Sequence, residues 1–378
     1  MIPLSTDDLP WFCDDGDRAL AARLRAAAPA LAAAEEAADE PARDRAAVAA
    51  LAEAGLFALV APADGQVRAR SLCLTRELLG WVNARADSIF AVQGLGSYAV
   101  LAAGDAAQRA RLPDLAAGRA VAAFALTEPE AGSDVAAIST RAVADGDGYR
   151  LTGEKMFISN LGLASVATVV ATVDPALGRK GLTAFWLPLD GPGVTVVPQA
   201  PIAPHPLGRL ILDGARATRI GEVGAGFGLA MRTLDTFRVS VAAAAVGMAR
   251  RALDEAARHV RARVQFGKPL AEQPLVQAHL ADMATQIDSA RLMTWRAAAV
   301  KDAGARGTVE VSMAKLHATE AAQDVIDRAV QLLGGRGVVA GAMVEHLYRA
   351  IRPLRIYEGT SEIQRTIIGR AIATGGSP

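Results

Sequence analysis

The feature that most constrains the fold of this chain is a change of pattern, because short β-rich runs lie between two long helical stretches. Apolar residues have helical spacing from Asp17 to about Ala120, and this spacing returns from Gly226 onward. Between them, runs such as YRLTGEKMFIS and SVATVVATV are separated by Gly, Pro and Asp turns, which is typical of strands. The chain therefore divides into a helical part, a β part and a second helical part.

This order predicts an α+β protein that is mostly α. The expected domains are an N-terminal helical domain over 1–120, a middle antiparallel β domain over 121–224 and a C-terminal helical bundle over 225–378. The bundle is expected because long helical stretches are joined only by the short breaks GKP and GGRG. These stretches are 229–259, 273–302 and 309–333.

Charge and cysteine usage exclude some classes of partner. Lys plus Arg and Asp plus Glu both number 40, so the net charge of 0 gives no electrostatic reason to expect nucleic acid or an anionic membrane as partner. Cys13, Cys73 and the His residues lack metal-ligand spacing, which predicts a reduced intracellular protein without a metal site. The N-terminus does not resemble a signal peptide and no apolar run approaches a membrane span, so we expect a cytoplasmic location.

Two segments of the β part carry groups that could bind a cofactor. In FALTEPEAGSD, residues 124–134, the turn N–H groups with Thr127 and Ser133 can bind ring carbonyls or phosphate oxygens. In GEKMFISN, Phe157 can shield a flat cofactor while Ser159 donates a hydrogen bond to it. The alternatives are an ordinary turn between strands, and a core Phe beside a surface Ser.

Two segments of the C-terminal part could approach a phosphate. RVQFGKP begins at Arg263 after a strongly basic helix, and an Arg at a helix end can hold phosphate, although a charge that merely faces water is the alternative. QLLGGRG begins at Gln331 and ends a helix in glycines. A C-cap explains one glycine, whereas a second one also permits close approach of a ligand or another backbone.

RIYEGTSEIQR, residues 355–365, is the most informative segment. Apolar residues precede Glu358, and Thr360 or Ser361 offers an N-cap for the helix that follows. A carboxylate beside apolar neighbours at a chain turn can have a raised pKa, which suits a general base that works near neutrality. The alternative is a capping or surface glutamate.

Seven segments in the same order resemble the acyl-CoA dehydrogenase family, from about residue 45 to the C-terminus. They are FALTEPEAGSD, GEKMFISN, LDTFR, RVQFGKP, AKLHATEAAQ, QLLGGRG and IYEGTSEIQR. The resemblance implies a helical domain, a β domain and a C-terminal four-helix bundle. It also implies a homo-oligomer, usually a tetramer, that binds FAD at a subunit interface.

Carried over residue by residue, the resemblance makes Glu358 the catalytic base. Some family members carry the base just before the Arg of the LDxxR helix, but this chain has Phe237 there, so Glu358 is the only matching candidate. The resemblance assigns FAD binding to Phe124, Leu126, Thr127, Gly132, Ser133, Phe157, Ile158, Ser159, Arg263, Phe266, Gln331, Gly334, Gly335, Thr360 and Glu362. It assigns substrate binding to Ser133, Asp235, Arg238, Tyr357 and Gly359.

Some positions depart from the family pattern. Pro274 stands where the family usually has a Gln near the FAD phosphates, and Ala350 replaces a familiar Asp. Asp87 stands where members that handle dicarboxylic acyl groups can carry an Arg, which predicts a hydrophobic or neutral acyl group. Candidates for lining the acyl pocket are Phe90, Gln93 and Leu95.

The resemblance implies α,β-dehydrogenation of an acyl-CoA thioester to the trans-2-enoyl thioester, with an electron-transfer flavoprotein as electron acceptor. A dehydrogenase of carrier-protein-bound thioesters and an acyl-CoA oxidase are alternatives within the same fold. A catalytically silent acyl-thioester-binding scaffold is the non-enzyme alternative, and the presence of Glu358, Thr127 and Ser133 argues against it.

Overall fold

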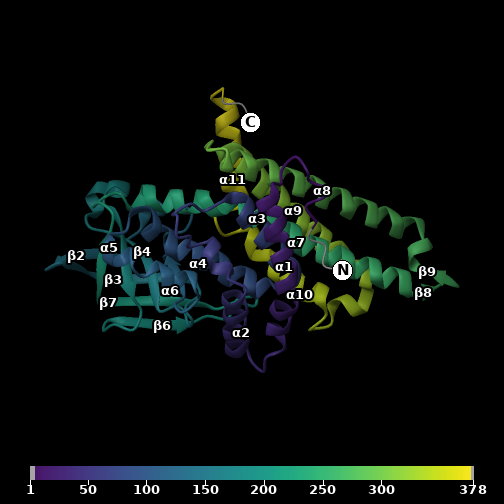
Figure 1. Cartoon of the computed structure of the whole chain (residues 1–378), viewed down its shortest axis with the longest axis horizontal. Helices are drawn as coiled ribbons and strands as arrows, with labels where there is room; N and C mark the ends of the chain where they lie inside the picture. The colour runs from purple at the N-terminus through teal and green to yellow at the C-terminus, as the bar shows by residue number, and fades with distance from the viewer. Residues whose placement is uncertain (1–4, 376–378) are drawn as a thin grey trace.

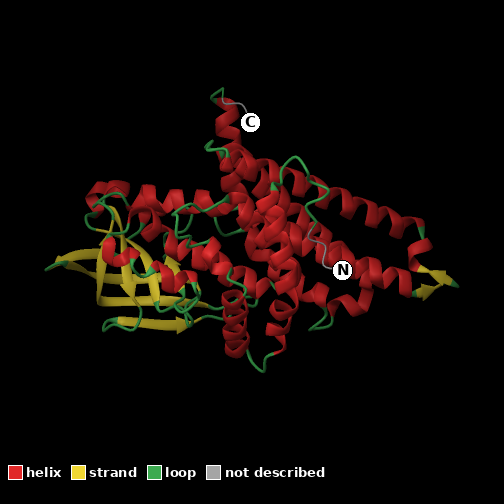
Figure 2. Ribbon diagram, viewed as in Figure 1, coloured by secondary structure: helices red, strands yellow, loops and turns green. Residues whose placement is uncertain are grey.

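The structure, a computed structural model, describes residues 5–375. A sheet lies at one end of an elongated molecule, and long helices run from it to the other end (Figures 1 and 2). Helices come first in the chain, strands follow, and helices return after the last strand of the sheet. The predicted fold class, mostly α with a β part between two helical parts, is confirmed.

Several of the N-terminal helices begin at polar caps that the sequence supplies. These helices are α1 (Asp15–Ala33), α2 (Glu40–Glu53), α3 (Ala69–Val82), α4 (Ala84–Ala103), α5 (Ala106–Arg109) and α6 (Leu112–Ala116). Asp14 caps α1 in a capping box with Asp17, Asp39 caps α2, and Asn83 caps α4. These side chains accept hydrogen bonds from N–H groups that have no partner inside the helix.

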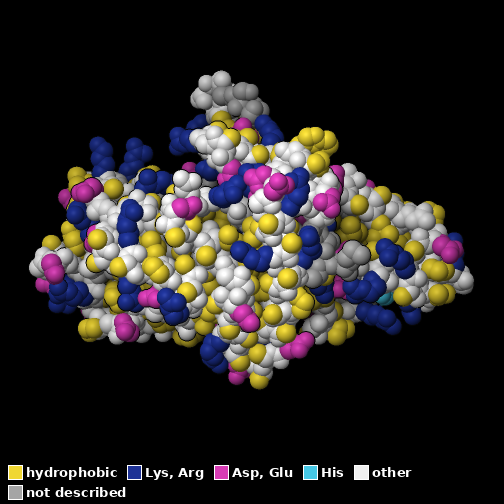
Figure 3. All heavy atoms as spheres, in the orientation of Figure 1, with side chains coloured by type: hydrophobic (Ala, Val, Ile, Leu, Met, Phe, Trp, Pro, Cys, Tyr) yellow, Lys and Arg dark blue, Asp and Glu magenta, His cyan; other side chains and the backbone are white. Residues whose placement is uncertain are grey.

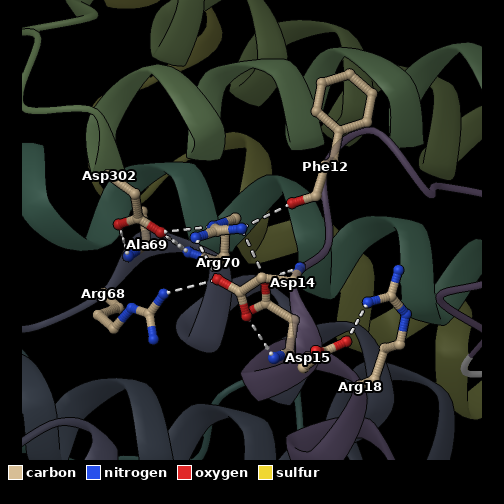
Figure 4. Close-up of polar contacts among 9 residues, drawn as sticks. Phe12, Asp14, Asp15, Arg18, Arg68, Ala69, Arg70 and Asp302 are labelled. Atoms are coloured by element: carbon tan, nitrogen blue, oxygen red, sulfur yellow. Dashed lines mark hydrogen bonds and ion pairs between the residues drawn. The ribbon is translucent and has the colours of Figure 1, made fainter.

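The N-terminus of α3 is capped from a distant part of the chain (Figure 4). The carboxylate of Asp302, the last residue of α8 (Pro274–Asp302), accepts hydrogen bonds from the Ala69 N–H at 2.7 Å and the Arg70 N–H at 3.0 Å. Arg70 in turn donates to the Phe12 carbonyl at 2.9 Å and the Asp14 carboxylate at 2.9 Å. One cluster therefore ties α3 to the bundle and to the segment before α1.

The strands of the β part form one sheet that closes on itself. They are β1 (Ala122–Ala125), β2 (Arg141–Asp145), β3 (Gly148–Ser159), β4 (Val166–Thr172), β5 (Leu182–Pro188), β6 (Val194–Pro198) and β7 (Leu207–Ile220). The order is β1-β4-β2-β3-β7-β5, with β6 on β7, and β4 also pairs with β5. Its interior is filled by small and branched side chains and by Phe185.

The β part differs from the sequence expectation in three respects. The pairings of β1 and β2 with β4 are parallel, whereas the other pairings are antiparallel. β2 was not recognised, because its residues RAVAD have mostly exposed side chains and lack an apolar run. β7 continues through the Asp213–Gly214 pair that reads as a turn, because Gly214 has a φ of 66° within the strand.

The C-terminal part is dominated by three long antiparallel-packed helices. Its elements are α7 (Gly226–Ala262), α8, α9 (Thr308–Leu333), α10 (Met343–Ile351) and α11 (Ser361–Ala373). A hairpin of two short strands, β8 (Val264–Gln265) and β9 (Lys268–Pro269), follows α7. The hairpin lies at the end of the molecule opposite the sheet (Figure 1).

Two glycines bring α3 and α7 into backbone contact. A Cβ atom on Gly80 would collide with the Ala244 carbonyl oxygen, and one on Gly247 would collide with the Glu77 carbonyl oxygen. No side chain larger than hydrogen fits at either position. This close approach places the side chains of α3 directly beside those of α7 and the turn before α11.

Helix α4 is long and apolar enough to cross a bilayer by length and composition, with a mean hydropathy of 1.2. However, 78% of its most apolar window is buried inside the protein, as in the core helix of a folded domain.

On the face shown in Figure 3, acidic and basic side chains are interspersed. This mixture agrees with the net charge of 0.

Candidate active site

Glu358 lies in the turn between a short 3-10 helix (Arg352–Arg355) and α11. Its φ of 52° is in the left-handed region, which is uncommon for a residue with a side chain, and Gly359 follows with a φ of 93°. Thr360 then caps α11 by accepting a hydrogen bond from the Ile363 N–H at 3.3 Å. The turn therefore reverses the chain and directs the Glu358 side chain inward, where it is only 9% exposed.

Three side chains hold the strained backbone of this turn. Arg238 Nε donates to the Glu358 carbonyl oxygen at 2.9 Å, and Lys315 Nζ donates to the Gly359 carbonyl oxygen at 2.8 Å. Gln364 Nε2 donates to the Gly359 carbonyl oxygen at 3.0 Å. Strained backbone persists only where its surroundings fix it, so these contacts set the position of the Glu358 carboxyl group.

The Glu358 carboxyl group is buried but incompletely paired. Within residues 5–375, its Oε2 atom has no hydrogen-bond partner, and its backbone N–H donates no hydrogen bond. Burial raises the pKa of Glu358, the cations of Arg76, Arg238 and Lys315 oppose this rise, and Asp87 adds to it. A raised pKa and a free oxygen are the properties of a group that can accept a proton from a ligand.

A buried ion pair lies beside Glu358. Arg76 on α3 donates from Nε and Nη2 to the two carboxylate oxygens of Asp87 on α4, both at 2.8 Å, and the side chains are 1% and 2% exposed. Arg76 also donates to Ser240 Oγ on α7 at 3.1 Å, and its charge lowers the pKa of Glu358. Asp87 is therefore the partner of a buried cation that acts on the proposed base.

The predicted substrate residues Asp235 and Arg238 lie together on α7. Arg238 Nη1 is 2.6 Å from Asp235 Oδ1, and the Arg238 side chain is 7% exposed whereas that of Asp235 is 33% exposed. Arg238 thus spans from Asp235 to the backbone of Glu358. Phe237, between them, is fully buried with its ring edge against Tyr98, so no ionisable group occupies the alternative position for the base.

The β part brings several predicted cofactor residues to one edge of the sheet. The Met156 N–H donates to the Thr127 carbonyl at 2.9 Å, which joins the FALTEPEAGSD loop to the end of β3. Phe157 is 59% exposed and has a φ of 58°. Within the described chain, the hydroxyl groups of Thr127, Ser133 and Ser159 have no hydrogen-bond partner.

These groups fit a flat ring system that accepts hydrogen bonds. The exposed Phe157 ring can cover a face of such a ring system, and the unpaired hydroxyl groups can donate to its edge. The side chains of Leu126 and Ile158 belong to the core and that of Phe124 is half-buried, so these residues offer mainly backbone groups. Gly132 is exposed on the same loop.

The loop from Thr127 to Thr140 is anchored by a buried carboxylate. Glu128 accepts hydrogen bonds from the Ser139 N–H at 2.7 Å, the Thr140 N–H at 3.0 Å and Lys155 Nζ at 2.7 Å. Burial would raise the pKa of Glu128, but Lys155 and these donors lower it to about 2. The ionised pair fixes the loop that carries Thr127 and Ser133.

A second set of predicted cofactor residues lies beside the β8–β9 hairpin. Phe266, in the hairpin turn, is 95% exposed with a φ of 54°, and Arg263 is exposed just after α7. Gln331, in the last turn of α9, and the following Gly334 and Gly335 are exposed, with open space where a Cβ atom on either glycine would lie. An exposed aromatic ring, an Arg and open glycines form a surface suited to a planar ligand with phosphate groups.

The two sets of predicted cofactor residues lie at opposite ends of the chain. The sheet edge is at one end of the molecule and the hairpin is at the other (Figure 1). Near the end of α7, burial and the charges of Arg336 and Arg263 lower the pKa of His259, so the charge of Arg336 in the turn after α9 acts on the end of α7. Thr360 and the exposed Glu362 are in neither set, at the start of α11.

Several residues near these sites were not identified from the sequence. Lys315 binds the turn around Glu358 from a distant part of the chain and Arg76 acts on the Glu358 pKa from α3, so no local sequence pattern predicts these two interactions. Gln364 binds the turn from the first turn of α11. Lys315 and Gln364 do lie in the motifs AKLHATEAAQ and IYEGTSEIQR. Gln273, directly before Pro274, offers an amide beside the position of the missing family Gln.

The three residues suggested for the acyl pocket are buried and make structural contacts. The side chain of Gln93 donates to the carbonyls of Leu115 and Ala120, both at 2.9 Å, and accepts from the Ala122 N–H at 2.8 Å. Phe90 and Leu95 belong to the core of the N-terminal part.

Over residues 5–375 there is no group of three or more His, Cys, Asp or Glu residues that could hold a metal ion.

Two segments of the chain match domains of a known protein family. Residues 123–215 match "Acyl-CoA dehydrogenase, middle domain", and residues 224–373 match "Acyl-CoA dehydrogenase, C-terminal domain". The chain is 40% identical over 308 residues to the probable acyl-CoA dehydrogenase FadE25 of Mycobacterium tuberculosis, covering 79% of each chain. These matches include the segments that hold Glu358 and the sheet edge.

Two further relatives are informative. The short-chain specific acyl-CoA dehydrogenase of Homo sapiens is 44% identical over 257 residues, which are 66% of this chain and 62% of that protein. The chain therefore spans about 62% of the length of that curated relative. A glutaryl-CoA dehydrogenase from Mycobacterium smegmatis, solved in complex with FADH2, has a TM-score of 0.87 at 27% identity and covers 100% of this chain and 99% of its own.

Proposed function

The chain belongs to the acyl-CoA dehydrogenase family, and on this basis we propose that it dehydrogenates an acyl-CoA thioester to the trans-2-enoyl thioester, with Glu358 as the base. The observation that carries the proposal is the setting of Glu358. Its carboxyl group is buried, one oxygen is unpaired within residues 5–375, and its backbone is fixed in a strained conformation. A structural glutamate in a core would have its oxygens paired.

The residues around Glu358 would position the substrate for proton removal. The free Glu358 N–H can donate to the thioester carbonyl, which makes the α-proton more acidic. The carboxylate then removes this proton, and its raised pKa matches the task. Arg238, Lys315 and Gln364 hold the carbonyl groups of the turn, so that the N–H and the carboxylate keep one geometry.

FAD is the cofactor that family membership indicates. At the sheet edge, Thr127, Ser133 and Ser159 would donate hydrogen bonds to it and Phe157 would cover its ring system. At the other end of the chain, Arg263, Phe266, Gln331 and the Gly334–Gly335 turn would hold its phosphate and adenine side. When bound, FAD supplies the hydride acceptor for the β-carbon.

The sheet and the β8–β9 hairpin lie at opposite ends of the molecule (Figure 1), so we propose that one FAD does not contact both sets of residues within a single chain. A second copy of the chain can supply the missing set, which favours a homo-oligomer with FAD between subunits. A tetramer is the arrangement that the resemblance implies. An electron-transfer flavoprotein is the electron acceptor that we propose on the same ground.

Anaerobic titration of the purified flavoprotein with a panel of acyl-CoA thioesters tests this function. We expect one acyl class to bleach the oxidised flavin band. Rapid re-oxidation in air with stoichiometric peroxide would instead indicate an acyl-CoA oxidase. Bleaching only by carrier-protein thioesters would indicate the carrier-protein alternative, and binding without bleaching would indicate the silent scaffold.

A further inference from the structure

A small cavity lies beside the base, between α4, the loop that joins β6 to β7, and the 3-10 helix before Glu358. Asp87 and Ser88 on α4, His205 in the loop and Tyr357 supply its polar lining. The rest of the lining is apolar, with Met248 and Leu354 among it. Tyr357 directly precedes Glu358 in the chain, so the cavity lies next to the turn that carries the proposed base.

Two of the polar lining groups have unused hydrogen-bonding capacity. The Ser88 hydroxyl has no partner within the described residues. Burial lowers the pKa of the half-buried His205 ring to about 4 and Arg85 adds to this effect, so the ring is neutral near pH 7 and one of its two nitrogens is a hydrogen-bond acceptor.

The charged lining group is already neutralised. Asp87 is paired through both oxygens with Arg76, so the pair presents no net charge to the cavity. Among the lining residues, all of them in the described part of the chain, there is no Lys or Arg. A ligand carboxylate would therefore meet Asp87 without a free cation to pair with.

We propose that this cavity receives the far end of the acyl group and selects an acyl chain that ends in a neutral hydrogen-bond donor, such as a hydroxyl group. This inference rests on the proposed dehydrogenase function and names its substrate class. The terminal O–H would donate to the acceptor nitrogen of His205 and accept from the Ser88 hydroxyl. A methyl group at the same place would displace water from both side chains and leave them unpaired, which is unfavourable in a buried site.

The test compares matched acyl-CoA thioesters of increasing length that end in methyl, hydroxyl or carboxylate. Binding is measured by calorimetry and by the shift of the flavin spectrum in the FAD-loaded Glu358→Gln variant, which does not consume the ligand. For one chain length, we expect the hydroxyl-terminated ligand to bind about tenfold more tightly than the methyl-terminated one, and the carboxylate-terminated ligand to bind least. Equal affinities for hydroxyl and methyl at every length, or a preference for carboxylate, would overturn the inference.

Variants of the lining residues test whether His205 and Ser88 cause the preference for a hydroxyl-terminated ligand. His205→Leu and Ser88→Ala should each remove most of the hydroxyl preference while retaining affinity for the methyl-terminated ligand. Ile202→Ala, an exposed position in the same loop, is the control and should keep the preference. If His205→Leu does not fold, Ser88→Ala alone tests the assignment, and a hydroxyl preference that survives in Ser88→Ala contradicts it.

Bleaching of the unmodified enzyme by methyl-terminated ligands without a hydroxyl preference would refute this inference alone, whereas no bleaching by any ligand would also refute the proposed function.

Discussion

At the scale of single residues, the charges around Glu358 decide when it can act as a base. Arg76, Arg238 and Lys315 favour its ionised form, whereas burial and Asp87 favour its protonated form. Asp235 and Glu320 in turn face two of these cations. The buried Arg76–Asp87 pair can be altered without removing any of the hydrogen bonds from Arg238, Lys315 and Gln364 to the backbone of the strained turn.

We predict opposite shifts of the pH profile from the two halves of this pair. Arg76→Gln removes a cation that lowers the pKa of Glu358, so the pKa rises and flavin reduction by substrate requires a higher pH, by about 1 pH unit or more. Asp87→Asn removes an anion that raises this pKa, so the profile moves to lower pH. The measurement is the rate of anaerobic flavin reduction as a function of pH.

Each single variant also leaves a buried charge unpaired, which we expect to lower the free energy of unfolding by about 3–5 kcal/mol. The double variant Arg76→Gln/Asp87→Asn is the control, since it removes both charges and should recover part of the stability and a profile near the original. A purely structural role would be revealed by shifts in the same direction for both single variants.

The prediction that Glu358 is the base came from the resemblance of its motif to the acyl-CoA dehydrogenase family, because the apolar neighbours and the following cap alone left a capping or surface glutamate as the alternative. The sequence could not identify Arg76, because this residue reaches the turn only through the contact of α3 with α7 at Gly80 and Gly247. Asp87 drew attention in the sequence because family members that handle dicarboxylic acyl groups can carry an Arg at this position. The structure shows that Asp87 itself forms an ion pair with Arg76. Residues that act across the fold lack a sequence signature of their own.

At the scale of elements, two buried carboxylates fix segments that the site depends on. Glu128 holds the loop that presents Thr127 and Ser133, and Asp302 caps the helix that carries Arg76. Both contacts join segments that are far apart in sequence. The sequence predicted the long helices closely because their periodicity is local, but it missed β2, which is defined by its pairing with β3 and β4.

We predict that Lys155→Met releases the flavin. The substitution leaves Glu128 buried without its cation, so the loop from Thr127 to Thr140 loses its fixed shape, and the protein loses about 3–5 kcal/mol of stability. Flavin content per chain after gel filtration is the measurement. Glu154→Gln, at a neighbouring position paired with Arg209 on the surface, is the matched control and should retain its flavin; unchanged flavin in Lys155→Met would contradict the anchoring role.

We predict that Asp302→Ala destabilises the protein by about 1–3 kcal/mol, because it leaves the N–H groups of Ala69 and Arg70 without their cap. Urea unfolding of the flavin-loaded protein measures this change. Asp64→Ala, which removes an exposed local hydrogen bond to the Gln66 N–H, should change stability by less than about 0.5 kcal/mol. Equal changes in the free energy of unfolding for the two substitutions would show that the Asp302 cap stabilises the protein no more than an exposed hydrogen bond does.

At the scale of the whole molecule, the separation of the two proposed cofactor surfaces supports the proposed homo-oligomer. The sequence motifs gave the members of both surfaces through a family resemblance, but only the fold shows that they lie at opposite ends. The exact limits of the three domains remain predictions. The order of the three parts, by contrast, follows from local periodicity alone and is confirmed by the structure.

We predict complementation between variants of the two surfaces. Ser133→Asp impairs the sheet edge and Arg263→Glu impairs the hairpin end, so each variant alone should lose most of its flavin. Co-expression should restore flavin in about a quarter of the sites if subunits mix at random, because a mixed pair contains a site with both surfaces intact. Flavin absorbance of the purified mixed oligomer is the measurement, and no recovery in an oligomer shown to contain both chains would argue against a shared site.

The most direct test of the account is the rate of anaerobic flavin reduction by the best acyl-CoA thioester in the Glu358→Gln variant, measured by stopped flow. Glutamine keeps the size of the side chain and the backbone contacts of the turn, but it cannot accept the α-proton. The account predicts an unchanged flavin content and ligand affinity with a reduction rate lower by at least about 10³-fold. Reduction at the original rate in the variant would contradict the assignment of Glu358 as the base.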